Sequence, residues 1–337
     1  MKGKSVNLLF RSWGSTSYEQ QTAKETPLPD PSSWREKRSD WGERLKITGL
    51  ELLQRSTNTL KDHQIEHPRL NAELLFAYSL NISREELYVR LRQEIKEEEK
   101  DALERLIQRR ISGEPLQYIL GHQEFWSINF EVDPRVLIPR PETELLVEQS
   151  LSILSEGTFK QNPSVLEIGT GSGAIAIALA KEVKNIFLVA TDISEGAVCL
   201  AKKNAKSAGV EDKVKFVNGD LFSPLRPSTG HGFFDLILSN PPYIVRRKIS
   251  TLAKEVKDYE PTIALDGGKD GLAFYRRIIP EASGYLREGG WLLLEVALGQ
   301  GPAVSGLIEK EGRFFSPECI PDLSGIGRVV KAQKRRA

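Results

Sequence analysis

Four consecutive residues, Asn240-Pro241-Pro242-Tyr243, are suited to holding a planar nitrogen group. They follow residues 235–239, an apolar segment typical of a strand, and open α/β sheets bind ligands at the carboxyl ends of their strands. Because proline has no backbone N–H, the available acceptors are the side-chain oxygen of Asn240 and the carbonyl of Pro241. Two such acceptors, beside the flat ring of Tyr243, favour methylation of an amide or of an exocyclic base amine.

A glycine-rich turn has the features of a cofactor site. The sequence Glu-Ile-Gly-Thr-Gly-Ser-Gly at residues 167–173 lies between a predicted strand at 165–168 and a predicted helix at 174–184. Glycines let a ligand approach the backbone closely, and the start of a helix offers free N–H groups. The carboxylate of Glu167 at the start of this turn disfavours a pyrophosphate and favours a cationic amino acid. The predicted cofactor contacts are Glu167, Gly169, Thr170, Gly171, Ser172 and Gly173.

Two further acidic positions complete the predicted nucleoside site. Asp192 follows the second predicted strand, where doubly wound folds place an acid on the ribose hydroxyls. Asp220 and Leu221 follow the third predicted strand, where an acid and an apolar side chain can contact the amino group and the face of an adenine. A nucleoside with an amino-acid tail is S-adenosylmethionine, and NAD is the main alternative.

These positions require elements that bring strand ends together. From residue 163 onwards, strands are predicted at 165–168, 186–191, 214–217, 234–238 and 291–296, and they alternate with helices that include 174–184 and 194–208. Such alternation implies right-handed crossovers and a mainly parallel sheet, so the fold class is α/β and Rossmann-like. Gly289 and Gly290 predict a turn immediately before the last of these strands.

The preceding part of the chain is predicted to be helical from about residue 42 to 112. Its leucines recur at helix-like spacing, Pro68 marks a helix start, and Ser83 with Glu86 forms a capping box. A small bundle of four or five helices results. Residues 113–118 then predict a loop, residues 126–132 predict a half-buried strand in a hairpin, and a further helix is predicted to end at about residue 154.

Composition narrows the class of protein. The chain has 337 residues, enough for about two domains, and its 47 Lys and Arg against 46 Asp and Glu give a net charge of +1. This balance argues against a protein that holds nucleic acid mainly by bulk charge. Cys199 and Cys319 lie far apart, and the four histidines lack metal-type spacing, so no metal is expected. No apolar run approaches the roughly 20 residues that span a bilayer, and a cytoplasmic location is predicted.

Four separate segments carry a strong resemblance to a known family. Residues 113–121 (GEPLQYILG), 136–144 (VLIPRPETE), 259–272 (with YEP and ALDGGKDGL) and 322–330 (DLSGIGRVV) occur together with the Asn-Pro-Pro-Tyr motif. That motif alone is also found in DNA adenine and some RNA guanine amino-methyltransferases. In this combination the chain resembles the HemK/PrmC protein-glutamine N5-methyltransferases over about residues 45–330.

The resemblance implies a fold, a cofactor and a substrate. The fold is a seven-stranded class I methyltransferase sheet preceded by a helical domain. S-adenosyl-L-methionine is expected to contact residues 169–173, Asp192, Leu221 and Asn240. The family often has Trp at the position of Leu221, so the adenine has a smaller stacking surface here. The substrate glutamine, from the Gly-Gly-Gln motif of a class I peptide chain release factor, is expected at residues 240–243.

The expected organisation has five parts. Residues 1–41 form a disordered extension, with an organelle presequence as the alternative; 42–112 form the helical substrate-recognition domain; 113–140 form a hinge and β-hairpin; 141–332 form the methyltransferase domain; and 333–337 form a basic tail. A monomer without stable nucleic-acid binding is expected. The alternative functions are a nucleic-acid amino-methyltransferase, acting on adenine N6 or guanine N2, and a non-catalytic cofactor-binding module. The first is disfavoured by the charge balance, the second by the intact Asn240 loop.

Overall fold

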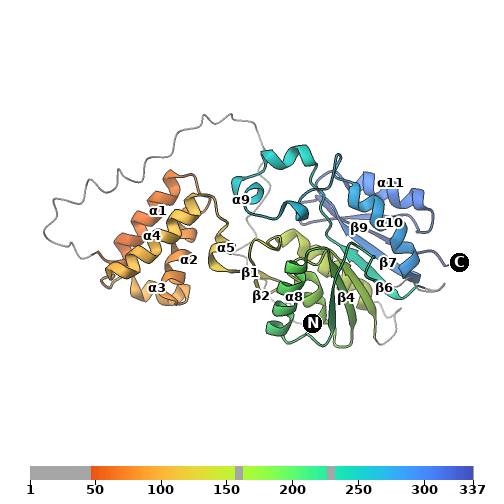
Figure 1. Cartoon of the computed structure of the whole chain (residues 1–337), viewed down its shortest axis with the longest axis horizontal. Coiled ribbons are helices and arrows are strands. Elements are labelled where there is room, and N and C mark those ends of the chain that lie inside the picture. Colours follow the sequence, from red (N-terminus) through yellow and green to blue (C-terminus); the bar gives the residue numbers. More distant parts are fainter. Residues whose placement is uncertain (1–46, 156–161, 226–231, 337) are drawn as a thin grey trace.

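A computed structural model describes residues 47–155, 162–225 and 232–336. The predictions for residues 1–41 therefore lie outside the described residues. Figure 1 shows a helical bundle beside a larger unit built on a β-sheet, with a short helix and a hairpin between them. Within the described ranges, no helix is both long and apolar enough to cross a membrane.

The bundle contains helices α1 (Gly49–Asp62), α2 (Pro68–Leu80), α3 (Arg84–Arg90) and α4 (Glu97–Ile111). Pro68 is the first residue of α2, and the predicted capping box between Ser83 and Glu86 begins α3. Such caps typically stabilise a helix by about 1 kcal/mol. The helices pack their leucine stripes into one buried cluster that includes Leu53, Leu60, Leu75, Phe76 and Leu103.

The connection to the sheet differs from the sequence prediction in two places. Residues that were predicted as loop begin helix α5 (Leu116–Leu120), which ends at Gly121. The hairpin is formed by β1 (His122–Phe125) and β2 (Ile128–Glu131), and Trp126 lies in its turn instead of in a strand. Trp126 and Ser127 have φ values of 53° and 57°. Two residues with positive φ form the type of turn that follows the twist of a hairpin.

The main sheet has the strand order β5-β4-β3-β6-β7-β9-β8. Its first five strands in that order are parallel, and β9 is antiparallel to both of its neighbours. The strands are β3 (Ser164–Ile168), β4 (Phe187–Asp192), β5 (Val214–Asn218), β6 (Phe234–Ser239), β7 (Leu286–Glu295), β8 (Glu318–Pro321) and β9 (Gly327–Gln333). The predicted Rossmann-like α/β fold is confirmed, and the seven strands agree with the number that the family resemblance implied.

The glycine pair that predicted a turn lies inside β7. The strand begins at Leu286, and its pairing with β6 shifts register between Phe234 and Leu236. Gly289 has a φ of 76°, which absorbs the irregularity without ending the strand. Glycine here marks a bulge, a feature that the sequence pattern does not distinguish from a turn.

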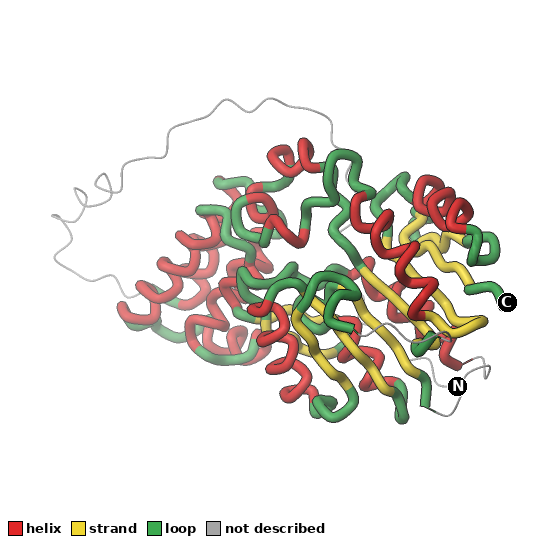
Figure 2. Tube along the Cα trace, turned by 45° about the vertical axis from the view of Figure 1, so that its right-hand side comes forward, coloured by secondary structure: helices red, strands yellow, loops and turns green. Residues whose placement is uncertain are grey.

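Helices cover both faces of the sheet (Figure 2). Helices α6 (Glu144–Ser155), α7 (Ala174–Glu182) and α8 (Glu195–Ala208) contribute to one buried cluster, and α10 (Ala273–Tyr285) and α11 (Gly301–Glu311) contribute to the other. The short 3-10 helix η4 (Pro141–Thr143) leads directly into α6. These two buried layers therefore fix the positions of the carboxyl ends of the strands.

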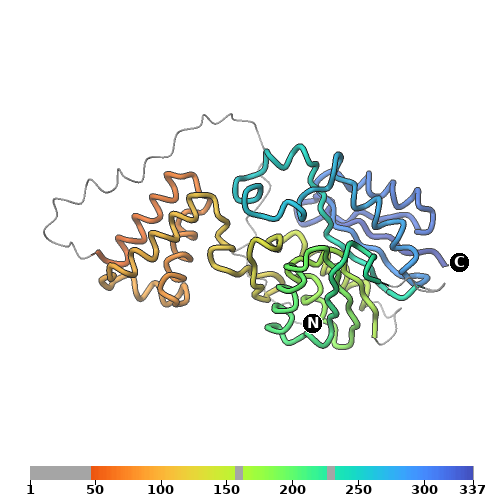
Figure 3. The backbone as a smooth tube through the Cα atoms, in the orientation of Figure 1, coloured from red at the N-terminus to blue at the C-terminus, as the bar shows by residue number. Residues whose placement is uncertain are grey.

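The segment between β6 and α10 contains η5 (Arg246–Thr251), α9 (Lys254–Lys257) and η6 (Thr262–Ala264), and it reaches towards the bundle (Figure 3). Its main contact is an ion pair of 2.8 Å between Arg110 Nη2 on α4 and Glu255 Oε2 on α9. The Tyr259 hydroxyl also donates to the Ser112 carbonyl at 3.3 Å. The Arg110 side chain is only 7% exposed, so this contact is an integral part of the fold.

Candidate functional site

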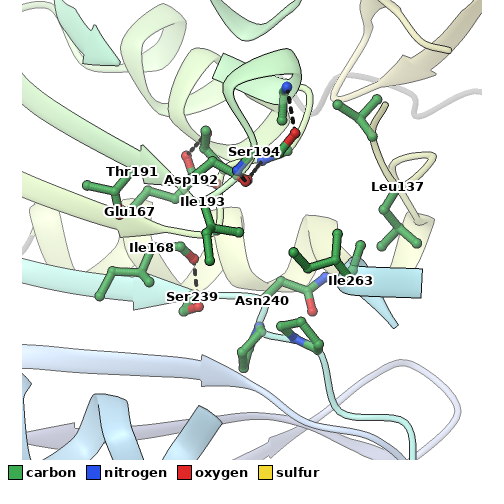
Figure 4. A pocket seen from close by; sticks show the side chains of 18 of the residues that line it. Leu137, Glu167, Ile168, Thr191, Asp192, Ile193, Ser194, Ser239, Asn240 and Ile263 are labelled. Atoms are coloured by element: carbon green, nitrogen blue, oxygen red, sulfur yellow. Dashed lines mark hydrogen bonds between the residues drawn. The ribbon is translucent and has the colours of Figure 1, made fainter. Parts of the chain in front are cut away.

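A cavity of about 340 Å³ opens at the carboxyl ends of the parallel strands. Its walls come from the β3–α7 turn, the ends of β4 and β6, residues 135–143, and residues 261–264 (Figure 4). Most of the predicted site residues line it: Glu167, Gly169, Thr170, Gly171, Ser172, Asp192, Asp220, Leu221, Asn240, Pro241 and Pro242. Gly173 and Tyr243, which were also predicted, are not part of this lining.

Gly171 and Gly173 have different surroundings. Both have positive φ, 55° and 83°. A Cβ on Gly171 would meet nothing within 4 Å, whereas one on Gly173 would lie 2.9 Å from Ile177 Cδ1 and 3.2 Å from Ala201 Cβ. Gly173 therefore allows α7 to pack against α8, and Gly171 leaves the turn open towards the cavity.

The buried carboxylate of Glu167 has one oxygen engaged and one left over. Oε2 accepts hydrogen bonds from the Thr170 hydroxyl at 2.7 Å and from the Ala176 N–H at 3.1 Å. Oε1 is buried and has no hydrogen-bond partner among the residues that the structure describes. Burial raises the pKa of Glu167 to about 8. A cationic amino group in the cavity would satisfy Oε1 and favour the charged form, whereas a pyrophosphate would be repelled.

Asp192 at the end of β4 holds the glycine turn in place. Its Oδ2 accepts from the Gly171 N–H at 2.8 Å, and its Oδ1 accepts from the Ser194 N–H at 2.9 Å. Burial raises the pKa of this carboxyl group. A carboxylate has about four lone-pair sites, so two remain for hydroxyl groups of a ligand. The sequence predicted that Asp192 binds ribose hydroxyls, but it did not predict that this side chain also holds the glycine turn.

The two residues predicted to contact an adenine sit differently from each other. Leu221 is buried in the cavity wall, and its φ of 49° makes a sharp turn at that point. Asp220 is partly exposed and pairs with Arg277 of α10 through Arg277 Nη2 and Asp220 Oδ2, 2.6 Å apart. Arg277 also lines the cavity and was missed by the sequence reasoning.

Asn240 projects into the cavity with its amide group held by a neighbour (Figure 4). Its Nδ2 donates to the Thr143 hydroxyl oxygen of η4 at 3.1 Å. Because Nδ2 bonds Thr143, Oδ1 is the end of the amide group that can accept a hydrogen bond from a ligand. The end of β6 is fixed as well, because the Ser239 hydroxyl donates to the Ile168 carbonyl of β3 at 2.7 Å.

Tyr243 is placed behind the cavity and not along it. Its ring packs against the buried cluster beneath α10 and α11, and burial raises its pKa. The Tyr243 carbonyl accepts from Gln300 Nε2 at 3.0 Å. A Cβ on Gly267 would come within 2.7 Å of the Tyr243 backbone, so that glycine permits a close approach. Tyr243 therefore anchors the Asn-Pro-Pro-Tyr loop, and the position of its ring against a bound ligand stays a prediction.

A buried ion pair shapes the entrance. Arg140 lines the cavity and pairs with Glu260, which is almost fully buried and also accepts from the Ile138 N–H at 3.3 Å. Burial raises the pKa of Glu260, and the Arg140 guanidinium opposes that shift. This pair joins residues 136–144 to residues 259–261, two segments that the sequence analysis singled out separately. No group of His, Cys, Asp and Glu side chains in the described ranges could hold a metal ion.

Two family comparisons match the chain in separate regions. Residues 51–121 match the PrmC N-terminal domain, and residues 143–256 match the methyltransferase small domain.

Curated relatives match most of the chain. A release factor glutamine methyltransferase from Geobacter sulfurreducens is 44% identical over 271 residues, which cover 80% of this chain and 91% of the relative. Proteins of the same name from Moorella thermoacetica (40% identical, covering 80% and 93%) and Neisseria gonorrhoeae (42% identical, covering 78% and 92%) are similar over comparable lengths. The chain therefore belongs to the release factor glutamine methyltransferase family.

Proposed function

We propose that this enzyme transfers a methyl group from S-adenosyl-L-methionine to the side-chain amide nitrogen, N5, of the glutamine in the Gly-Gly-Gln motif of class I peptide chain release factors. The observation that carries the proposal is the Asn240 amide group. Its N–H is engaged by Thr143, so its oxygen is left as an acceptor inside the cavity. An acceptor suits a substrate NH2 group, and family membership identifies that group as a glutamine amide.

Several residues are suited to hold the cofactor. The unpartnered oxygen of Glu167 fits the cofactor's ammonium group, and the remaining acceptor sites of Asp192 fit ribose hydroxyls. The open turn at Gly171 and the apolar wall at Leu221 leave room for a flat base. When bound, the cofactor supplies a methyl group activated by a sulfonium centre.

The protein's part in the reaction is to orient the target nitrogen. Asn240 Oδ1 and the Pro241 carbonyl accept both N–H bonds of the substrate amide, which points the nitrogen at the cofactor end of the cavity. An amide nitrogen keeps its protons at neutral pH and is a weak nucleophile, so its alignment by the two acceptors is the protein's main contribution before the transfer. As the new N–C bond forms, the bond between the methyl group and the sulfonium sulfur breaks, and the nitrogen then loses its extra proton to water.

The helical bundle is suited to recognise the protein substrate. Within the described ranges, no residue of α1 to α4 lines the cavity, yet α4 contacts α9 and Tyr259 on the loop that borders it. Specific protein partners usually need about 1,200–2,000 Å² of interface, more than a short glutamine loop provides. Since the substrate is a translation factor, we place the activity in the cytoplasm and expect a monomer without stable nucleic-acid binding.

Labelling of separate substrate pools tests this function. The enzyme is incubated with methyl-labelled cofactor and, in parallel, with release factor, total RNA or DNA. We expect label only in the release factor, and none in a release factor whose motif glutamine is replaced by glutamate. Label in RNA or DNA instead would favour the nucleic-acid amino-methyltransferase and contradict the proposal.

A further inference from the structure

A second buried carboxyl group lies next to Asn240, on the neighbouring strand. Glu295 is the last residue of β7, and it is 2% exposed. Strands β6 and β7 are parallel and pair Ser239 with Leu294, so the next residues, Asn240 and Glu295, leave the sheet side by side. Glu295 does not line the cavity, and its Oε2 has no hydrogen-bond partner within the described part of the chain. A buried carboxyl with an unused oxygen is costly, so its presence here calls for a function.

Thr143 connects this carboxyl group to Asn240. The Thr143 hydroxyl oxygen accepts the Asn240 amide N–H at 3.1 Å and is itself buried. The hydroxyls of Thr143 and Tyr243 lie beside the Glu295 carboxyl group and favour its charged form. A hydroxyl has one hydrogen to donate and two lone pairs to accept with. Thr143 can therefore donate to Glu295 while it accepts from Asn240.

We infer that Glu295 is a positioning residue that acts through Thr143 to hold the Asn240 amide with its oxygen towards the substrate glutamine. The inference rests on the proposed function and adds a residue to it. A carboxylate only accepts hydrogen bonds, so it makes Thr143 the donor and leaves the threonine oxygen to accept from Asn240. The amide then has one orientation, the one that presents Oδ1 to the cavity.

The protonation state of Glu295 decides whether this arrangement holds. Burial raises the pKa of Glu295 to about 7, and the negative charge of Glu142 on η4 raises it as well. Arg328 on β9 and the two hydroxyls act in the opposite direction. Tyr275 on α10 donates only to the backbone carbonyl of Glu295, at 2.7 Å.

Protonation would weaken the hold on Asn240. A protonated carboxyl group can donate its own hydrogen to the Thr143 oxygen, in competition with the Asn240 amide. The carboxylate form, and with it the fixed amide, is therefore populated as the pH rises through about 7. The titratable group next to Asn240 is therefore Glu295, and it would make the rate depend on pH although the substrate amide itself does not titrate.

Single-turnover rates on intact release factor at saturating cofactor test the inference. Between pH 6 and 8 the wild-type rate should rise by up to about tenfold, as one group with a pKa near 7 ionises. Glu295→Gln keeps an acceptor for Thr143 but cannot titrate, so its profile should be flat over this range. Thr143→Val should lower kcat by about 10- to 100-fold with little change in the KM for cofactor, because the amide loses its orientation.

Matched variants separate positioning from general damage to the core. Thr143→Ser keeps the hydroxyl and should recover most of the rate lost in Thr143→Val. Ser150→Ala removes another fully buried hydroxyl, one that bonds only within α6, and should leave rate and pH profile unchanged. A Glu295→Gln profile that still rises like the wild type, or an equal loss in Thr143→Ser and Thr143→Val, would overturn the inference.

A spectroscopic measurement decides the same question without any substrate. In protein labelled with ¹⁵N-asparagine, the side-chain amide signal of Asn240 is identified by its loss in Asn240→Ser. In the wild type its shifts should change with a midpoint near pH 7, and the change should vanish in Glu295→Gln. No titration, or an identical titration in Glu295→Gln, refutes the coupling. If the coupling is present but release factor is not methylated, the proposed function fails and the positioning role stands.

Discussion

At the residue scale, the cavity joins two unlike polar ends. Glu167 and Asp192 place carboxyl groups at one end, the first of them buried, and Asn240 places a neutral amide oxygen at the other. The acidic end suits a cation, and the amide end suits an uncharged NH2 group, since an acceptor there need not be ionised. This division separates the acceptors suited to an ammonium group from the acceptor suited to an uncharged amide.

The raised pKa of Glu167 predicts that cofactor binding releases a proton. With a pKa of about 8, the free enzyme holds this carboxyl mostly protonated at pH 7. A bound ammonium group requires the carboxylate, so about 0.9 proton should leave per binding event at pH 7. Affinity should therefore rise with pH up to about 8. Calorimetry with S-adenosylhomocysteine, in buffers of different ionisation enthalpy, measures the released proton.

The matched control is Glu167→Gln. It should abolish the proton release and weaken binding by roughly 10- to 150-fold, the range expected for losing a charged hydrogen bond of about 1.5–3 kcal/mol. Equal heats in all buffers for the wild-type protein would show that Glu167 does not pair with the ligand's amino group.

Asn240→Ala should separate catalysis from cofactor binding. Losing an oriented contact to the reacting group commonly costs about 10²–10³ in rate. The side chain lies at a strand end and donates only to Thr143, so the fold should persist and S-adenosylhomocysteine should bind with nearly wild-type affinity. Single-turnover methylation of release factor measures the rate. Near-normal methylation by this variant would exclude the proposed role.

At the scale of elements, the site depends on how strands and helices meet at the carboxyl ends of the parallel strands. The turn between β3 and α7 is held by the end of β4, through the Asp192 carboxylate and through the Thr191 carbonyl, which accepts from the Gly169 and Thr170 N–H groups. The loop after β6 is held by Gln300, the residue before α11, which donates to the Tyr243 carbonyl. Contacts with neighbouring elements therefore add to the bonds within the turn, such as the Thr170 hydroxyl to Glu167.

Two glycines of the same turn should respond differently to alanine. Both have positive φ, where a side chain costs about 1–2 kcal/mol. Gly173→Ala adds a clash with Ile177 and Ala201, worth about 1–3 kcal/mol more, and should destabilise the fold clearly more than Gly171→Ala. Gly171→Ala should instead affect mainly cofactor affinity, because its Cβ points into open space. Urea unfolding and calorimetry compare the pair, and equal losses of stability would contradict this assignment.

At the scale of the whole molecule, the bundle and the sheet meet through the loop that borders the cavity. They are joined by contacts between Arg110 and Glu255, between Ser112 and Tyr259, and between Gly113 and Lys254. Glu260, the residue after Tyr259, pairs with Arg140 at the cavity wall. A protein substrate bound to the bundle would therefore sit beside the residues that frame the entrance. This arrangement fits a division of labour between recognition and chemistry.

Removing the bundle tests that division. A chain that starts at Gly113 should keep its affinity for S-adenosylhomocysteine and lose most activity on intact release factor, mainly through a raised KM. Circular dichroism must first show that it folds, because Glu255 loses its partner Arg110. Unchanged kcat/KM on intact release factor, or loss of cofactor binding by a folded truncation, would contradict the separation of roles.

The sequence alone was sufficient for features that depend on neighbouring residues. The capping box at Ser83, the strand–turn–helix around residues 167–173 and the proline-fixed loop after β6 are local, because each is set by a few consecutive residues. The alternation of strands and helices predicted the sheet, since parallel strands need crossovers. Errors arose where a local signal has two meanings: the Gly289-Gly290 pair is a bulge, and Trp126 begins a turn.

Only the tertiary structure decided which distant side chains support the site. Thr143 and Asn240 are 97 positions apart, and no pattern along the chain links either of them to Glu295. They meet because the parallel strands β6 and β7 end side by side and Thr143 of η4 contacts Asn240 there. The same holds for the pairing of Arg140 with Glu260 and for the inward position of Tyr243. A side-chain hydrogen bond or buried ion pair depends on the directions of several elements at once, and those directions are fixed only when the whole core has packed.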